Sequence, residues 1–199
     1  SDATGSTRRG GNWDLEMRRG AIETAPLFTA GTRWDGLLDN ILLTGADEAR
    51  AGTAGADVFV VPENWGSDTL TGGGGADVID LSSVAGGLQV TIDGAQVSVT
   101  YRDATRPGTL NFQAAAGQSF SIKGGTGDDV FVVRDASMLT GIEGGQGRDR
   151  IDFATLAAVG LTRAGATTTV SGQGRSYTAL AVEDLVRLRR LRQVERDTR

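Results

Sequence analysis

Short runs in which apolar and polar residues alternate follow one another through the chain, separated by glycine-rich turns. Leu88–Thr100 reads LQVTIDGAQVSVT and Leu161–Gly172 reads LTRAGATTTVSG. An alternation of period two is typical of half-buried strands, and the pairs Asp93-Gly94 and Ala164-Gly165 predict tight turns within them. Each stretch is therefore predicted to form a β-hairpin. A further strand is predicted at Ser119–Lys123.

Two parts of the chain repeat each other. Gly52–Ser83 aligns without a gap with Gly124–Thr155, 72 residues later, and 13 of the 32 positions are identical. Glycines, aspartates and the run Val-Phe-Val-Val account for most of the identities, and a predicted hairpin follows each copy. We therefore predict an all-β protein with a duplicated unit, in residues 45–123 and 124–199, preceded by an N-terminal segment in residues 1–44.

The two ends differ from the repeated middle. Residues 11–25 alternate Trp13, Leu15 and Met17 with polar neighbours, which predicts a hairpin, and residues 26–44 are predicted to be a linker. Val182–Arg199 combines spaced apolar residues with many arginines. This pattern predicts either a last strand that continues into an amphipathic helix or a basic cap on the second unit.

Composition excludes several classes of function. The 199 residues include 30 glycines but no cysteine and no histidine, which rules out disulfides, zinc sites built on those residues and histidine-based catalysis. The net charge of −5 argues against nucleic acid as a partner, and no apolar run is long enough to span a bilayer. One enzyme alternative is a polysaccharide lyase built on a parallel β-solenoid, in which an arginine such as Arg134 or Arg148 would act as the base. Such an enzyme needs a long solenoid with a substrate groove, and this chain has two short repeat units, so we do not expect an enzyme.

A nine-residue pattern, G-G-x-G-x-D-x-U-x with U a large apolar residue, occurs within each copy. Residues 72–80, 124–132 and 144–152 fit it fully, residues 52–60 carry Thr53 in place of the second glycine, and residues 63–71 are a degenerate version. The glycines allow a tight turn whose carbonyl oxygens point inward, and the aspartate adds a carboxylate oxygen. Such an all-oxygen donor set predicts a hard cation, Ca²⁺.

The aspartates of each copy are 20 residues apart, slightly more than the two nonapeptides that make one turn of a parallel β-roll. Each pair is still predicted to stack and to flank one ion. The predicted metal-site residues are Asp57, Asp77, Asp129, Asp149, Asp68 and Asp128, with the loop glycines Gly55, Gly73, Gly75, Gly125, Gly127, Gly145 and Gly147. Two alternatives stay open. The aspartates can cap the loop backbone, as in Asx-turns, and Arg148 and Arg150 can pair with Asp149.

These nonapeptides resemble the RTX, or haemolysin-type, calcium-binding repeats of bacterial proteins that are secreted by the type I route. The resemblance implies a parallel β-roll that folds with calcium outside the cell. The segment Ser1–Leu38 is similar to the end of a caspase-like domain of giant bacterial surface proteins, whose His and Cys would lie upstream of Ser1. The chain is thus expected to be an internal portion of a longer protein.

Together these features predict a non-enzymatic, calcium-binding structural module of a large secreted or cell-surface protein, of the spacer or adhesin type. The alternative is a carbohydrate-binding β-roll module, for which Trp65 is the best candidate to stack on a sugar ring. Besides calcium, the expected partners are surface glycans and further copies of the same module, joined end to end.

Overall fold

A computed structural model of the protein describes residues 39–153, 160–172 and 175–186. These residues form sixteen strands and no helix, so the predicted all-β class is confirmed. The strands are β1 (Asp39–Leu42), β2 (Ala49–Ala51), β3 (Asp57–Val60), β4 (Ser67–Thr71), β5 (Ala76–Asp80), β6 (Leu88–Asp93), β7 (Gln96–Tyr101), β8 (Thr109–Gln113), β9 (Ser119–Lys123), β10 (Val130–Asp135), β11 (Leu139–Glu143), β12 (Arg150–Asp152), β13 (Gly160–Ala164), β14 (Thr167–Gly172), β15 (Arg175–Leu180) and β16 (Asp184–Val186).

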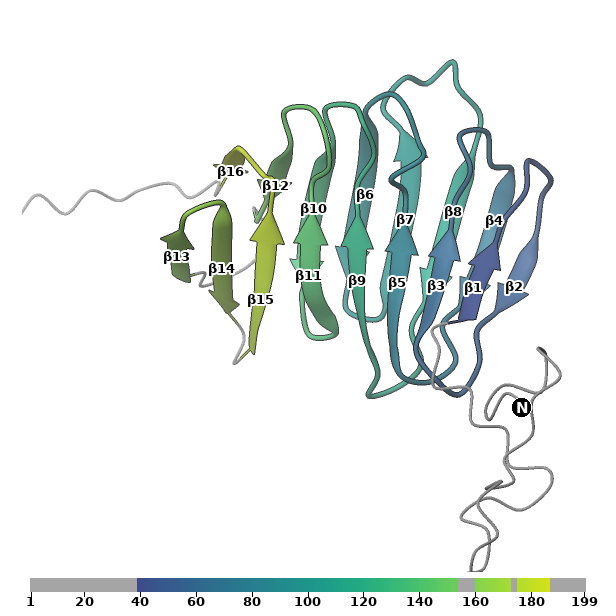
Figure 1. The fold of residues 1–199 in the computed structure, drawn as a ribbon, viewed down its shortest axis with the longest axis horizontal. Coiled ribbons are helices and arrows are strands. Elements are labelled where there is room, and N and C mark those ends of the chain that lie inside the picture. Colours follow the sequence, from purple (N-terminus) through teal and green to yellow (C-terminus); the bar gives the residue numbers. More distant parts are fainter. Residues whose placement is uncertain (1–38, 154–159, 173–174, 187–199) are drawn as a thin grey trace, which may run out of the picture. The chain divides into compact units, whose positions relative to one another are not determined.

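The strands form two eight-stranded sheets that face each other (Figure 1). Sheet A has the order β1-β3-β5-β9-β11-β15-β14-β13, and sheet B has the order β16-β12-β10-β6-β7-β8-β4-β2. Most neighbours are parallel, because the chain crosses from one sheet to the other after most strands. The sheets also contain two antiparallel meanders, β6–β7–β8 in sheet B and β13–β14–β15 in sheet A. Gly94 and Gly165 form their first turns with φ of +61° and +62°, which confirms both predicted hairpins.

Corresponding strands of the two copies lie in opposite sheets. In the first copy β3 and β5 belong to sheet A and the meander to sheet B, whereas the matching β10 and β12 belong to sheet B and their meander to sheet A. The chain changes sheet after most strands, but the three meander strands stay in one sheet. From β3 to β10 the chain therefore crosses between the sheets an odd number of times, and the second copy starts in the other sheet. The glycine loops of the first copy therefore precede sheet A strands, and those of the second precede sheet B strands.

The space between the sheets is filled by apolar side chains, as the alternating pattern predicts. Phe59, Ile79, Phe131 and Ile151, the large apolar residues of the four best nonapeptides, are completely buried. The ring of Phe112 packs edge-on between Phe59 and Phe120, with centroid distances of 5.7 and 5.6 Å. A few phenylalanines thus occupy the centre of a core that is otherwise made of valine, isoleucine and leucine.

The stack begins earlier than the expected unit boundary at residue 45. β1 lies within the segment predicted to be a linker, yet it pairs in parallel with β3. Asp35–Arg199 forms one compact unit, separate from Ser1–Trp34. The hairpin predicted at residues 11–25 and the arginine-rich tail from residue 187 onward lie outside the described residues. So do residues 1–38, the segment with a resemblance to a caspase-like domain. Within the described residues no helix could cross a membrane.

Candidate functional site

The four nonapeptide aspartates are buried and stacked in pairs. Asp57 and Asp129 have no exposed surface, and neither Asp77 nor Asp149 exposes more than 1%. The main-chain N–H of Asp57 donates to Asp77 Oδ1 at 3.1 Å, and that of Asp129 donates to Asp149 Oδ1 at 2.8 Å, each across 20 residues of sequence. The predicted stacking of these aspartates from one coil to the next is confirmed.

In the second copy such bonds form a ladder, that is, a row of carboxylates that each accept a main-chain N–H from the next coil. In the second copy the N–H of Leu88 donates to Asp129 Oδ1, and the N–H of Asp149 donates to Glu183 Oε2 at 2.7 Å. Sequence analysis missed Glu183, although it stands directly before β16, as Asp129 and Asp149 stand directly before β10 and β12. Asp77, Asp129, Asp149 and Glu183 each accept from the neighbouring coil, and Asp57 accepts from Thr53 in its own loop. Capping of the loop backbone, one of the open alternatives, therefore takes place.

The first and second aspartates of each copy differ in how their other oxygen is used. Asp57 Oδ2 accepts from the N–H of Thr53 at 2.7 Å, and Asp129 Oδ2 accepts from the N–H of Gly125 at 2.9 Å. Asp77 Oδ2 and Asp149 Oδ2 are buried and have no hydrogen-bond donor within the described residues. The structure therefore distinguishes one satisfied and one unsatisfied carboxylate in each copy.

The backbone of the loops differs at the corresponding place. Gly73 and Gly145, the second glycines of the unsatisfied loops, adopt φ of +81° and +100°, whereas Thr53 and Gly125 are not in this left-handed region. The Thr53 hydroxyl also donates to the Asp57 carboxylate. The threonine that departs from the nonapeptide pattern thus supplies an extra donor to its own aspartate.

The first glycine of each loop makes room for the carboxylate. A Cβ on Gly72 would lie 2.2 Å from Asp77 Oδ2, and one on Gly144 would lie 2.5 Å from Asp149 Oδ2. The loops of successive coils also touch through their backbones, since the N–H of Gly74 donates to the Thr53 carbonyl at 2.7 Å. Among the predicted site glycines, a Cβ would fall within 2.5 Å of the backbone of a neighbouring coil at Gly73, Gly75, Gly125, Gly127, Gly145 and Gly147, but not at Gly55.

Burial dominates the electrostatics of the unsatisfied carboxyls. It raises the pKa of Asp77 to about 6, with a smaller contribution from the negative charge of Asp57. It likewise raises the pKa of Asp149 to about 6, where Asp129, Glu183 and Asp128 add negative charge. The main-chain donors lower both pKa values but do not outweigh the burial. Each carboxyl is thus a site where a proton or another cation is favoured.

The remaining predicted site residues fall into two groups. Asp68, in the degenerate nonapeptide, is 1% exposed, accepts from the N–H of Glu48 through Oδ1 and leaves its buried Oδ2 without a partner in the described residues. Burial raises its pKa too. Asp128 is exposed, and its Oδ1 accepts from the N–H of Arg148 at 2.8 Å. Asp68 therefore resembles Asp77 and Asp149, whereas Asp128 connects two loops at the surface.

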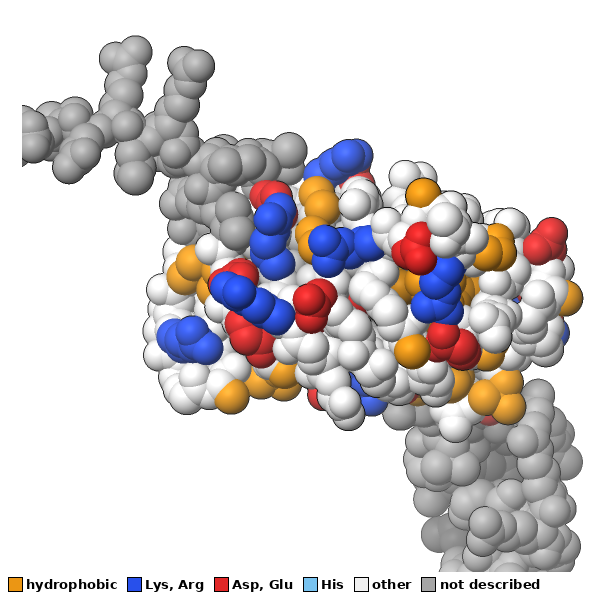
Figure 2. Space-filling view, turned by 90° about the horizontal axis from the view of Figure 1, so that it is seen from above, with side chains coloured by type: hydrophobic (Ala, Val, Ile, Leu, Met, Phe, Trp, Pro, Cys, Tyr) orange, Lys and Arg blue, Asp and Glu red, His pale blue; other side chains and the backbone are white. Residues whose placement is uncertain are grey.

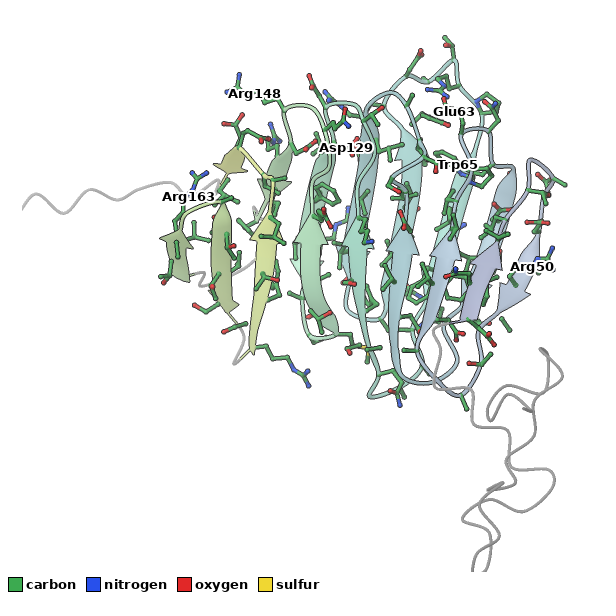
Figure 3. The ribbon with its side chains drawn as sticks, in the orientation of Figure 1. Arg50, Glu63, Trp65, Asp129, Arg148 and Arg163 are labelled. Atoms are coloured by element: carbon green, nitrogen blue, oxygen red, sulfur yellow. The ribbon has the colours of Figure 1, made fainter. Side chains whose placement is uncertain are left out.

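The arginines that flank Asp149 do not neutralise it. Arg148 forms an ion pair with Asp184 at 3.0 Å, and Arg150 forms one with Asp152 at 2.9 Å. The alternative in which these arginines satisfy Asp149 is therefore not realised. Figure 2 shows acidic and basic side chains next to one another over the loop edge on which Arg148 lies (Figure 3).

The donor chemistry of the loops fits calcium. Within the described residues no three acidic side chains come together as a metal-binding group, so an ion here would use few carboxylates. Calcium takes six to eight oxygen ligands and accepts backbone carbonyls among them. Asp77 Oδ2 lies beside Gly72 and Asp149 Oδ2 lies beside Gly144, the first glycine of each loop. These loops supply oxygen alone, which excludes a thiolate- or imidazole-selective metal.

Trp65 packs inside the protein and does not present a surface to sugars. It is 3% exposed, and its indole stacks on the ring of Tyr101 with a centroid distance of 4.3 Å. The guanidinium of Arg106 covers the Tyr101 ring at 3.8 Å and also pairs with Glu63, which lies near Trp65 (Figure 3). The suggested stacking of a sugar on Trp65 is therefore not supported.

Comparison of the chain with protein-family models and with curated proteins gives no match.

Proposed function

We propose that this protein is a calcium-binding structural β-roll module of a secreted or cell-surface protein, with no catalytic activity of its own. The observation that carries the proposal is that Asp77 Oδ2 and Asp149 Oδ2 are buried without a hydrogen-bond partner among the described residues. An ionised carboxylate buried without a donor is unfavourable by several kcal/mol, and it is retained only where something else compensates its charge. A divalent cation at each glycine loop would do so.

In this proposal Asp77 and its loop at residues 72–75 hold one ion, and Asp149 and its loop at residues 144–147 hold the second. Calcium supplies the positive charge that the carboxylate and carbonyl oxygens share. Asp57 and Asp129, whose oxygens already accept main-chain N–H groups, position the neighbouring coil. Dissociation constants of about 10⁻⁴ to 10⁻³ M are typical of extracellular calcium modules. The module would therefore be stabilised outside the cell.

Thermal unfolding in EDTA and across a calcium titration, combined with calorimetry, tests the proposal. For one site in that affinity range, about 10 mM calcium is expected to add roughly 1.4 to 2.7 kcal/mol to the free energy of unfolding. Asp77→Asn and Asp149→Asn are each expected to remove one part of this gain. The matched control is Asp93→Asn, because Asp93 is exposed and lies outside the glycine loops.

Calcium specificity gives a second criterion. Magnesium should stabilise the wild type less, because it requires a compact octahedral site and loses its water reluctantly. The proposal is contradicted if calcium neither binds nor raises Tm in the wild type. It is equally contradicted if the double variant Asp77→Asn/Asp149→Asn responds to calcium as the wild type does.

A further inference from the structure

A hollow of about 310 Å³ lies on the outer face of sheet B, across β4, β8, β7, β6 and β10. One row of its lining follows the strand register, because Thr69 is opposite Asn111, Asn111 opposite Ser98, and Ser98 opposite Thr91. All four side chains are exposed or half-buried. Four adjacent strands thus present hydroxyl and amide groups side by side, as both donors and acceptors.

The next row adds a carboxylate, which only accepts hydrogen bonds, and a guanidinium, which only donates them. Gln113 is opposite Gln96 and Gln96 opposite Asp93, and all three line the same hollow. The row ends at Arg134 on β10, where the pairing with β6 shifts between Val133 and Asp135. Such an irregularity re-aims a side chain. Arg134 lies at this shift, and its side chain lines the hollow.

Arg134 and Asp93 are free to meet a ligand. In the described part of the chain neither forms an ion pair or a side-chain hydrogen bond, whereas Arg106, Arg148 and Arg150 each pair with a carboxylate. An unpaired guanidinium is a strong donor and an unpaired carboxylate a strong acceptor, so each forms charge-assisted bonds with neutral hydroxyl groups. Together they leave the lining without net charge.

We infer that this hollow binds a neutral saccharide. A sugar offers closely spaced hydroxyl groups that match the alternating donors and acceptors of the two rows. Every lining side chain that is exposed or half-buried carries a hydroxyl, amide, carboxylate or guanidinium group. The carboxylate of Asp93 together with the net charge of −5 disfavours a polyanion. The volume is at the small end of ligand pockets, which suits a short stretch of sugar.

The inference does not depend on calcium, because no residue of the hollow belongs to the glycine loops. The two proposals can therefore fail separately. Asp93→Asn is expected to weaken saccharide binding and leave the calcium response intact. Asp77→Asn is expected to weaken the calcium response and to leave saccharide binding intact. Saccharide binding of this variant is measured in calcium, at a temperature where the variant is folded.

Affinity electrophoresis in gels that contain dextran, glucomannan or galactan, with polygalacturonate as the acidic comparison, tests the inference. The wild type is expected to be retarded by at least one neutral polysaccharide. Arg134→Gln is expected to weaken that binding about tenfold or more, as the loss of a charge-assisted hydrogen bond predicts, and Asn111→Ala by a smaller factor. Arg163→Gln, on the exposed strand β13, is the matched control and should bind as the wild type does.

Three results would overturn the inference: no retardation by any of the neutral polysaccharides, retardation by polygalacturonate alone, or unchanged binding in both Arg134→Gln and Asn111→Ala. Both side chains are exposed, so circular dichroism should show the wild-type fold in both variants. If Arg134→Gln nevertheless unfolds, Asn111→Ala still decides the location, because binding that it does not weaken contradicts the assigned site.

Discussion

Replacing Gly144 with alanine is expected to lower the free energy of unfolding by about 3 kcal/mol or more, among the largest effects of a single substitution. The new Cβ would lie 2.0 Å from the carbonyl oxygen of Ala181 and 2.5 Å from Asp149 Oδ2. The loop cannot easily move away, because the N–H of Gly144 donates to the Leu180 carbonyl at 2.9 Å. Urea unfolding followed by circular dichroism measures the change.

Gly55→Ala is the matched control within the same motif. The nearest atom to its new Cβ would be Thr53 Oγ1, at an ordinary contact distance of 3.7 Å, and Gly55 is not in the left-handed region. A glycine in such a place is expected to tolerate alanine or to gain about 0.4 to 1 kcal/mol, because the unfolded chain loses freedom. Equal stability of Gly144→Ala and the wild type would contradict the close approach of the coils.

In calcium-free buffer the protein is expected to become more stable as the pH falls from 7 to 5. The folded state raises the pKa of Asp77 and Asp149 from 3.8 to about 6, so it binds more protons than the unfolded chain over this range. Stability that depends on such a raised pKa is complete below the unfolded value and is lost as the pH rises through the folded value. The gain between pH 7 and 5 is roughly 1 kcal/mol per carboxyl.

Thermal melts in EDTA at pH 7, 6 and 5 measure this dependence. The double variant Asp77→Asn/Asp149→Asn should show a flatter profile, and Asp93→Asn should follow the wild type. Acidification below pH 5 is expected to lower the stability again. Hydrogen bonds lower the pKa of Glu48, Glu63 and Asp103, and the stabilising contribution of these carboxylates is lost when they are protonated. A Tm that falls between pH 7 and 5 would show that the two buried carboxyls titrate normally.

Much of the fold follows from local pattern. Period-two alternation places Phe59 and Ile79 in the core, and glycines that reach positive φ set the turns at Gly94 and Gly165. The 20-residue spacing stacks Asp57 on Asp77 and Asp129 on Asp149, because a coil without a meander has this length in both copies. Features of this kind depend on neighbours in sequence, or on a repeat length that can be counted along the chain.

Other features depend on which coil lies beside which, and the local pattern does not encode that. The second copy exchanges sheets because the first makes an odd number of crossings, which leaves its glycine loops before sheet B strands. Asp129 Oδ1 accepts from the N–H of Leu88, 41 residues away, whereas Asp149 Oδ2 has no donor in the part of the chain that the structure describes. Arg134 joins Thr69 in one hollow because five strands pack side by side. Pairing, burial and the supply of donors are set jointly by distant segments, so they are present only in the folded chain.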